Sequence, residues 1–188
     1  MAEASPDLFQ ETERLVLRRE RAGDRAEWAA RINTPEVMAR MGGPLSPEAL
    51  AESFDRMATA ELPYLLLERR TERDLIGKCG LSRIITPHAP PALSGQVQVG
   101  WTLRADCWGQ GLATEAARVM LNHAFARLNC DAVFSQTSES NRRSWGLMQR
   151  LGMRRASELQ YPDPDYPPED NPTIVFVIEK QEWLSING

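Results

Sequence analysis

Hydrophobic residues alternate with polar or small ones from Val97 to Leu103, which is the pattern of a half-buried β-strand. A polar stretch and two closely spaced glycines follow this strand. From Leu112, apolar residues then recur at helical spacing to about Leu128. The pattern therefore predicts a strand, a glycine turn and a helix in direct succession.

The glycine turn, Trp108-Gly109-Gln110-Gly111, favours an anion site. Glycine lets the backbone approach a phosphate, and the first N–H groups of a helix lack intrahelical partners and carry partial positive charge. An ordinary turn with a helix cap would account for the same residues. The dinucleotide fingerprint is excluded because a third glycine and a parallel βαβ pattern are missing, and the nucleotide-hydrolase loop is excluded because no Gly-Lys-Ser/Thr is present.

The rest of the chain predicts short strands, amphipathic helices and two proline-rich loops. Helices are expected after the N-cap residues Asp24, whose helical stretch reaches Met41, and also Ser46 and Asn141. The loop Tyr161–Pro172 is expected at the surface, either as an acidic lip that attracts a cationic amine or as a solvated hairpin loop. The other loop is Thr86–Gly95, and the further strands are Glu13–Arg19, Tyr64–Glu68, Leu75–Ile85, Asp131–Thr137, Met153–Leu159 and Thr173–Gln181.

Composition narrows the function classes. The chain has 188 residues, of which 42% are hydrophobic and 26% charged, as is usual for a soluble globular protein. Its formal net charge of −4 argues against a nucleic-acid partner, although local basic patches stay open at Arg69, Arg70 and Arg73 and at Arg142, Arg143 and Arg150. No signal-peptide core and no apolar run of the ~20 residues that a membrane helix needs is present, so no membrane partner is expected.

The cysteines and histidines are few and widely spaced. Cys79, Cys107 and Cys130 form no Cys-x-x-Cys pair, and His88 and His123 are the only histidines. We therefore expect no metal site, no Ser-His-Asp triad, and reduced thiols in a cytoplasmic protein. Cys107 lies beside the glycine turn, where a packed small residue is the preferred interpretation and a reactive thiol the alternative.

Three motifs together resemble the GCN5-related N-acetyltransferases, in particular their branch similar to ribosomal-protein-alanine acetyltransferases. The first is Gly100-Trp101 followed by the run from Trp108 to Ala116, which resembles the family's acetyl-coenzyme A loop. Thr12–Arg18 resembles the opening strand of this branch. Asn141-x-x-Ser144, followed by Leu151-Gly152-Met153, resembles its second motif. The resemblance covers roughly residues 12–180.

This resemblance implies an α/β (α+β) fold: a central, mixed, mostly antiparallel twisted sheet of about seven strands, flanked by about four helices. We expect a single domain over residues 1–188, with its core at about 12–180 and a polar tail at 1–11. The early helices would lie over the substrate end, where four side chains either line a pocket or, preferably, pack in the core: Trp28, Met38, Met41 and Phe54.

The resemblance also implies an acetyl-CoA-dependent N-acetyltransferase with no metal. A backbone N–H near Trp101, Thr102 or Leu103 would polarise the thioester carbonyl. Asn141 would bind the pantetheine arm, and Ser144 would lie near the sulfur as general acid. The pyrophosphate would lie on the loop that consists of Trp108, Gly109, Gln110, Gly111, Leu112, Ala113 and Thr114.

One departure from the family leaves the general base unassigned. Gln98 stands where many relatives carry an acid, so the base is Glu139, an acid of the Tyr161–Pro172 loop, or solvent. The alternative to an enzyme is a non-catalytic module that senses acetyl-CoA. The acceptor is expected to be a primary amine, either a protein N-terminus or a small molecule, and a homodimer stays open because dimers are common among relatives.

Overall fold

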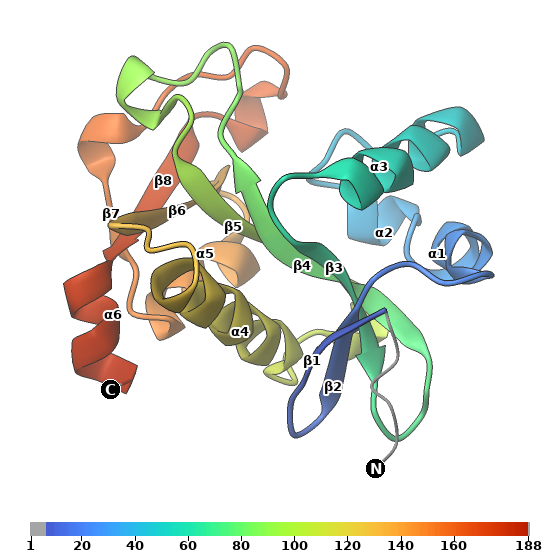
Figure 1. The fold of residues 1–188 in the computed structure, drawn as a ribbon. Coiled ribbons are helices and arrows are strands. Elements are labelled where there is room, and N and C mark those ends of the chain that lie inside the picture. Colours follow the sequence, from blue (N-terminus) through green and yellow to red (C-terminus); the bar gives the residue numbers. More distant parts are fainter. Residues whose placement is uncertain (1–6, 188) are drawn as a thin grey trace. The chain divides into compact units, whose positions relative to one another are not determined.

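The computed structural model describes residues 7–187 (Figure 1). These residues fall into two compact units. Unit 1 contains the described residues up to Gly80 together with Trp101–Val119. Unit 2 contains Leu81–Gly100 together with the described residues from Met120 onward.

The described residues contain eight strands: β1 (Leu8–Glu11), β2 (Leu15–Arg18), β3 (Tyr64–Arg69), β4 (Leu75–Arg83), β5 (Val97–Leu103), β6 (Ala132–Ser138), β7 (Arg154–Arg155) and β8 (Thr173–Glu179). They form one sheet with the hydrogen-bonded order β1-β2-β3-β4-β5-β6-β8-β7. Neighbouring pairs such as β2–β3 and β6–β8 are antiparallel, whereas β5 and β6 are parallel, with Gln98 opposite Phe134. The expected mixed α/β class is confirmed, with eight strands where about seven were predicted.

Six α-helices lie in the same described range, where about four were predicted: α1 (Asp24–Arg31), α2 (Pro35–Met38), α3 (Pro47–Thr59), α4 (Leu112–Ala126), α5 (Arg142–Arg150) and α6 (Lys180–Asn187). The Ser46 and Asn141 side chains accept hydrogen bonds from the backbone N–H groups of Ala49 and Ser144, so both predicted N-caps are confirmed. Within residues 7–187, no helix has the length and apolar character needed to cross a membrane.

Two predictions for the N-terminal part were wrong. Residues 8–11 of the expected polar tail form β1, because they pair with β2 and complete its backbone hydrogen bonds. Residues 1–6 of that tail lie outside the described range. Asp24 is the first residue of α1 and not its N-cap, which is Gly23. Its carboxylate instead accepts two hydrogen bonds from the buried Arg18 guanidinium, at 2.7 and 2.9 Å.

The predicted helical stretch from Asp24 to Met41 is divided into two helices. Thr34 caps α2 through its side chain, and Pro35 begins that helix because its missing N–H is not needed there. Trp28 of α1 packs edge-on against Phe54 of α3, with 5.8 Å between ring centroids. Trp28, Met38 and Phe54 are buried, so core packing was the right interpretation for them, whereas Met41 is 40% exposed.

The C-terminal part differs from its prediction in two elements. The strand expected at Met153–Leu159 is reduced to β7, and a 3-10 turn, Ser157–Leu159, follows it. The last strand ends at Glu179, because α6 begins there and Glu182 accepts a hydrogen bond from the Glu179 backbone N–H.

The loop Tyr161–Pro172 is less exposed than predicted. Asp163 is 3% exposed, and Asp170 is 7% exposed. Asp170 accepts hydrogen bonds from the hydroxyl groups of Ser138 and Ser140, at 3.1 and 2.5 Å. Two of the four acids in this loop are therefore structural, because buried carboxylates need partners.

Two glycines of β4 allow close backbone approach in unit 1. A Cβ atom at Gly77 would lie 2.1 Å from the carbonyl oxygen of Thr102. A Cβ atom at Gly80 would lie 2.3 Å from the Cα atom of Tyr64, which is its cross-strand partner on β3. Neither neighbour can move without displacing a strand, so both positions require glycine.

Gly80→Ala should lower the melting temperature by roughly 4–8 °C, because overpacking of this kind costs about 2 kcal/mol. Thermal unfolding followed by circular dichroism measures this change. The control is Gly146→Ala in α5, where the nearest atom is a flexible arginine nitrogen at 3.6 Å. Alanine there should raise stability by roughly 0.5–1 kcal/mol. Equal melting temperatures for the two variants would contradict the close approach at Gly80.

Candidate active site

The predicted glycine turn lies between β5 and α4, within unit 1. A 3-10 turn, Ala105–Cys107, leads from β5 into it. Gly109 and Gly111 have φ angles of +73° and +78°, which residues other than glycine rarely adopt. The Trp108 indole N–H donates to the carbonyl oxygen of Leu103 at 2.8 Å and so fixes the start of the turn.

Six consecutive backbone N–H groups, from Gly109 to Thr114, make no hydrogen bond to any residue that the structure describes. The next residue, Glu115, is the first whose N–H donates a hydrogen bond, to the carbonyl oxygen of Gly111. The unpaired donors lie at the N-terminal end of α4, where the helix dipole adds partial positive charge. The turn can therefore receive an anion without losing an existing hydrogen bond.

The N-terminal strand motif holds this turn in place. Glu115 accepts hydrogen bonds from the Thr12 hydroxyl at 2.6 Å and from the Arg14 backbone N–H at 2.9 Å. The Arg14 guanidinium donates to Glu115 at 2.7 Å and to the carbonyl oxygen of Gln110 at 2.8 Å. Sequence reasoning found both motifs but not this contact between them.

The residues predicted to polarise the thioester lie at the end of β5. Trp101 is partly exposed, whereas Thr102 and Leu103 are both buried, so the predicted alternation does not continue through these last residues. The carbonyl oxygens of Thr102 and Leu103 face Gly77 and the Trp108 indole, respectively. The backbone here is tightly fixed by its neighbours within unit 1.

In unit 2, Asn141 and Ser144 lie at the start of α5. The side-chain oxygen of Asn141 accepts from the Ser144 N–H at 3.3 Å. Within the described part of the chain, the Asn141 side-chain NH₂ and the Ser144 hydroxyl have no partner, and both residues are partly exposed. The Ser144 hydroxyl therefore has no hydrogen bond to lose if a ligand binds beside it.

Gln98 belongs to a chain of neutral hydrogen bonds in unit 2. Its amide donates to Ser82 at 3.3 Å and accepts from Gln136 at 2.8 Å, and Gln136 accepts from the Tyr161 hydroxyl at 2.7 Å. Sequence reasoning missed Gln136 and Tyr161, since neither belongs to a motif. None of the four side chains in this series of hydrogen bonds is ionised at neutral pH. Gln98 therefore does not supply the base that an acid at its position would supply.

Glu139, one of the acids considered as the base, pairs with Arg155 at 2.6 Å. Cys107 is buried, and burial raises the pKa of its thiol, so it is a packed residue as preferred from the sequence.

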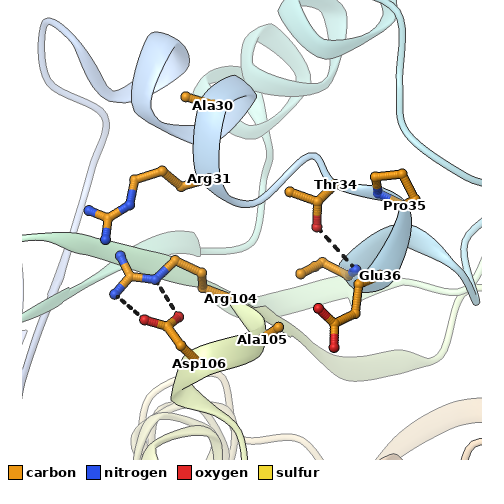
Figure 2. Close-up of a pocket in the computed structure, with 9 residues that line it drawn as sticks. Ala30, Arg31, Thr34, Pro35, Glu36, Arg104, Ala105 and Asp106 are labelled. Carbon is orange, nitrogen blue, oxygen red and sulfur yellow. Dashed lines mark hydrogen bonds and ion pairs between the residues drawn. The ribbon is translucent and has the colours of Figure 1, made fainter.

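A hollow of about 630 Å³ opens in unit 1 beside the 3-10 turn (Figure 2). Its charged lining includes Arg31, Glu36, Arg104 and Asp106, and Arg104 and Asp106 pair at 2.6 Å. None of the predicted binding residues lines this hollow.

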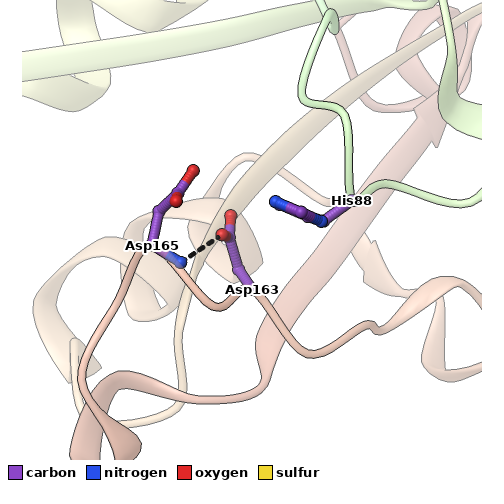
Figure 3. Close-up of side chains that lie close together, drawn as sticks. All are labelled: His88, Asp163 and Asp165. Carbon is purple, nitrogen blue, oxygen red and sulfur yellow. Dashed lines mark hydrogen bonds between the residues drawn. The ribbon is translucent and has the colours of Figure 1, made fainter.

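His88, Asp163 and Asp165 have side-chain ligand atoms within 4.8 Å of one another in unit 2 (Figure 3). Asp163 is positioned by the loop itself, because it accepts from the Asp165 backbone N–H at 3.1 Å and its own N–H donates to Asn171. Acidic groups commonly lie this close without an ion. Asp163 and Asp165 belong to the loop whose acids were considered as the general base.

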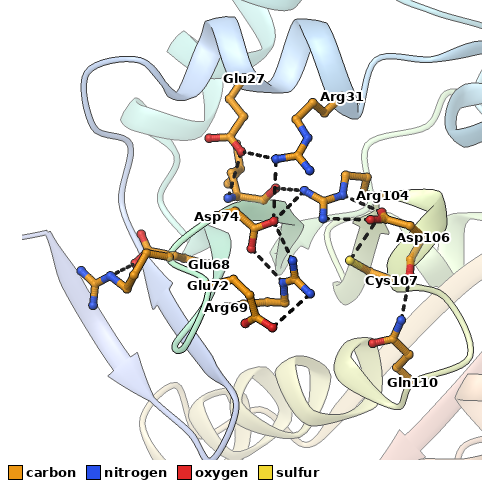
Figure 4. A network of polar contacts seen from close by, with 12 residues as sticks. Glu27, Arg31, Glu68, Arg69, Glu72, Asp74, Arg104, Asp106, Cys107 and Gln110 are labelled. Carbon is orange, nitrogen blue, oxygen red and sulfur yellow. Dashed lines mark hydrogen bonds and ion pairs between the residues drawn. The ribbon is translucent and has the colours of Figure 1, made fainter.

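A network of ion pairs in unit 1 lies beside the 3-10 turn Ala105–Cys107 (Figure 4). Asp74 accepts two hydrogen bonds from Arg69, both at 2.8 Å, and pairs with the buried Arg104 at 3.0 Å. Arg104 in turn binds Asp106, whose backbone oxygen accepts from the Gln110 side chain at 2.7 Å. The hydrogen bonds from Arg69, together with Arg104, lower the pKa of Asp74 to about 2.

Asp74→Asn should lower the free energy of unfolding by on the order of 2 kcal/mol at pH 7. Because the pKa of Asp74 is lower in the folded state, this stabilisation exists above the unfolded pKa of about 4 and disappears as the pH falls towards 2. Urea unfolding between pH 3 and pH 7 measures it. Glu52→Gln, in the exposed pair with Arg56, is the control and should have little effect throughout. A cost of Asp74→Asn that is independent of pH would show that its charge is not responsible.

Comparison with known proteins identifies acetyltransferases among both the family models and the relatives. A family model described as an acetyltransferase (GNAT) domain matches residues 14–154. The uncharacterized N-acetyltransferase p20 of Bacillus licheniformis is 25% identical over 159 residues, which cover 79% of this chain and 84% of the relative.

Solved structures share the fold. An acetyltransferase (GNAT family) from Bacillus anthracis has a TM-score of 0.74 at 19% identity, covering 93% of this chain and 99% of its own. Spermidine N-acetyltransferase from Vibrio cholerae, in complex with CoA and spermine, has a TM-score of 0.69 at 17% identity, covering 92% and 99%. The family match spans both the glycine turn and the Asn-x-x-Ser motif, and the chain therefore belongs to the GNAT acetyltransferase family and is an acyltransferase.

Proposed function

We propose that this enzyme transfers an acetyl group from acetyl-CoA to a primary amine, and that the turn Gly109–Thr114 binds the pyrophosphate. The observation that carries this proposal is the run of six backbone N–H groups without a partner in the described chain. GNAT enzymes use acetyl-CoA, and the Vibrio cholerae spermidine N-acetyltransferase with this fold holds CoA.

The turn needs little reorganisation to bind a phosphate. Trp108 fixes its first residue, and Gln110 is held on both sides, by Arg14 and by Asp106. Donors that are already oriented bind more strongly because no conformational entropy is lost on binding. Arg14 lies beside Gly111, but Glu115 pairs with its charge at 2.7 Å, so the role of Arg14 is to hold the turn.

The remaining roles are those that the resemblance to the acetyltransferase family implies. A backbone N–H at Trp101–Leu103 polarises the thioester carbonyl, and the Asn141 amide binds the pantetheine arm. The neutral acceptor amine attacks the carbonyl carbon, so that a C–N bond forms while the C–S bond breaks. The Ser144 hydroxyl donates a proton to the leaving sulfur and regains one from the amine nitrogen, which balances the reaction.

The acceptor class is a primary amine, either a peptide N-terminus or a small molecule. We place the enzyme in the cytoplasm, since Cys79, Cys107 and Cys130 are all free thiols. A panel of spermidine and of peptides with N-terminal serine or alanine, assayed for release of the CoA thiol, distinguishes these two acceptor classes.

Gly111→Glu should abolish measurable acetyl-CoA binding in a calorimetric titration, because the new carboxylate repels the pyrophosphate from the turn. Gly95→Glu is a matched control, since Gly95 has nearly the same φ angle, +77°, and open space around it. The control shares the backbone strain and should bind acetyl-CoA like the parent protein. Normal binding by Gly111→Glu would exclude the turn as the pyrophosphate site.

Ser144→Ala should leave the Kd for acetyl-CoA within about twofold and reduce kcat by roughly 10²-fold, as expected for loss of a general acid. Ser157→Ala, at an exposed serine, is the control for serine removal in unit 2. Parallel calorimetry and steady-state kinetics measure both quantities. If binding falls as much as turnover, Ser144 belongs to the binding site and not to proton transfer.

A further inference from the structure

Lysine is rare in this chain. Of 22 lysine and arginine residues, only Lys78 and Lys180 are lysines. Arginine stays protonated in proteins, whereas a lysine can lose its proton when it is removed from water. A lysine in a partly buried position of such an arginine-rich chain is therefore a candidate for proton transfer.

The Lys78 ammonium group lies among aromatic and sulfur-containing side chains in unit 1. Its nitrogen is 5.1 Å from the ring centroid of Trp28 and 5.4 Å from that of Tyr64, and 3.8 Å from the Met57 sulfur. Within residues 7–187 it has no carboxylate partner. This differs from the buried Arg18, which has two carboxylate partners.

The position of Lys78 also connects it with the end of β5. Gly77, the preceding residue, lies against the carbonyl oxygen of Thr102, which belongs to the segment that we propose polarises the thioester. The Thr102 hydroxyl contacts the sulfur of the exposed Met41 at 3.8 Å. Lys78 is itself partly exposed, so solvent or a substrate can reach this side of unit 1.

We propose that the Lys78 amine is the general base that deprotonates the acceptor ammonium group. In this step a proton passes from the acceptor nitrogen to the neutral lysine nitrogen, which gives a neutral amine ready to attack and a lysine ammonium. The lysine then returns its proton to solvent. This inference rests on the proposed acetyl transfer and fills the role that Gln98 does not perform.

The electrostatic surroundings support a lysine that is partly neutral near physiological pH. Burial, followed by the positive charge of Arg56 on α3, lowers the pKa of Lys78 to about 8. Arg56 is partly offset by Glu52, 3.6 Å away. On β3, burial raises the pKa of the Tyr64 phenol, so that group stays neutral. Trp28 on α1 does not titrate, and its ring favours the ammonium form.

The first test measures the titration of the lysine directly. With lysine labelled by ¹³C at the ε-carbon, the full chain gives two lysine signals, and Lys180→Arg assigns them. We expect the Lys78 signal to titrate at least one pH unit below an ordinary lysine, whose pKa is about 10.4. Titration of Lys78 at the ordinary value would overturn the proposal.

The second test measures kcat/KM against pH for wild type, Lys78→Arg, Lys78→Met and the control Lys180→Arg, using the amine of the panel that turns over fastest. Both Lys78 variants should lose roughly 10²–10⁴-fold in kcat/KM and the rise with pH that belongs to Lys78, while acetyl-CoA binding is unchanged. Lys180→Arg should behave like wild type. Arginine preserves the charge, so normal activity in Lys78→Arg would reduce Lys78 to a fixed cation and overturn the proposal.

The two proposals fail separately. Wild-type protein that binds acetyl-CoA and turns over, combined with normal Lys78 variants, overturns only the role of Lys78. Wild-type protein that does not bind acetyl-CoA overturns the proposed function, and the general base with it, whatever the lysine titration shows.

Discussion

The carboxylate of Glu115 is the contact on which the glycine turn depends. Burial opposes ionisation of this carboxyl group, but the hydrogen bonds from Thr12 and Arg14 outweigh it and hold its pKa below the usual value. These bonds join the residues just before β2 to the first turn of α4, about a hundred positions away in the chain. Because Arg14 also binds the Gln110 carbonyl, one ion pair fixes both sides of the turn. This ion pair therefore anchors the segment that carries the six unpaired N–H groups.

The turn and its flanking elements could be predicted because their signals are local. Period-2 alternation gives the bounds of β5, Val97–Leu103, and paired glycines with an apolar helical face give the turn and the start of α4. The Asn141 cap is local for the same reason, since its side chain bonds to a residue only three positions away. Family resemblance then gave functional roles to residues whose conformation the sequence already indicated.

The features that the sequence did not predict depend on side-chain contacts that the hydrophobic pattern does not reveal. The sequence predicts that Asp163 and Asp170 lie in an acidic surface loop. Asp170 instead accepts a hydrogen bond from the hydroxyl of Ser138, thirty-two positions earlier. Asp24 reads as an N-cap, because its preference for that position is strong, but the Arg18 guanidinium draws its carboxylate away. Lys78 is surrounded by two aromatic rings and one sulfur from three different elements, and no window of sequence contains them together.

The charge distribution bears on the proposed binding of acetyl-CoA, a strongly anionic molecule, by a chain with a net charge of −4. The arginines that suggested a basic patch, Arg69, Arg70 and Arg73, are paired with Asp74, Glu11 and Glu68, respectively. These three carboxylates neutralise the charge of the three arginines, which are therefore poorly suited to attract phosphates. The positive potential at the turn comes instead from backbone dipoles, which carry no net charge and need no counterion in the empty state. In the proposed site, these backbone donors, and not the net charge of the protein, would hold the phosphate.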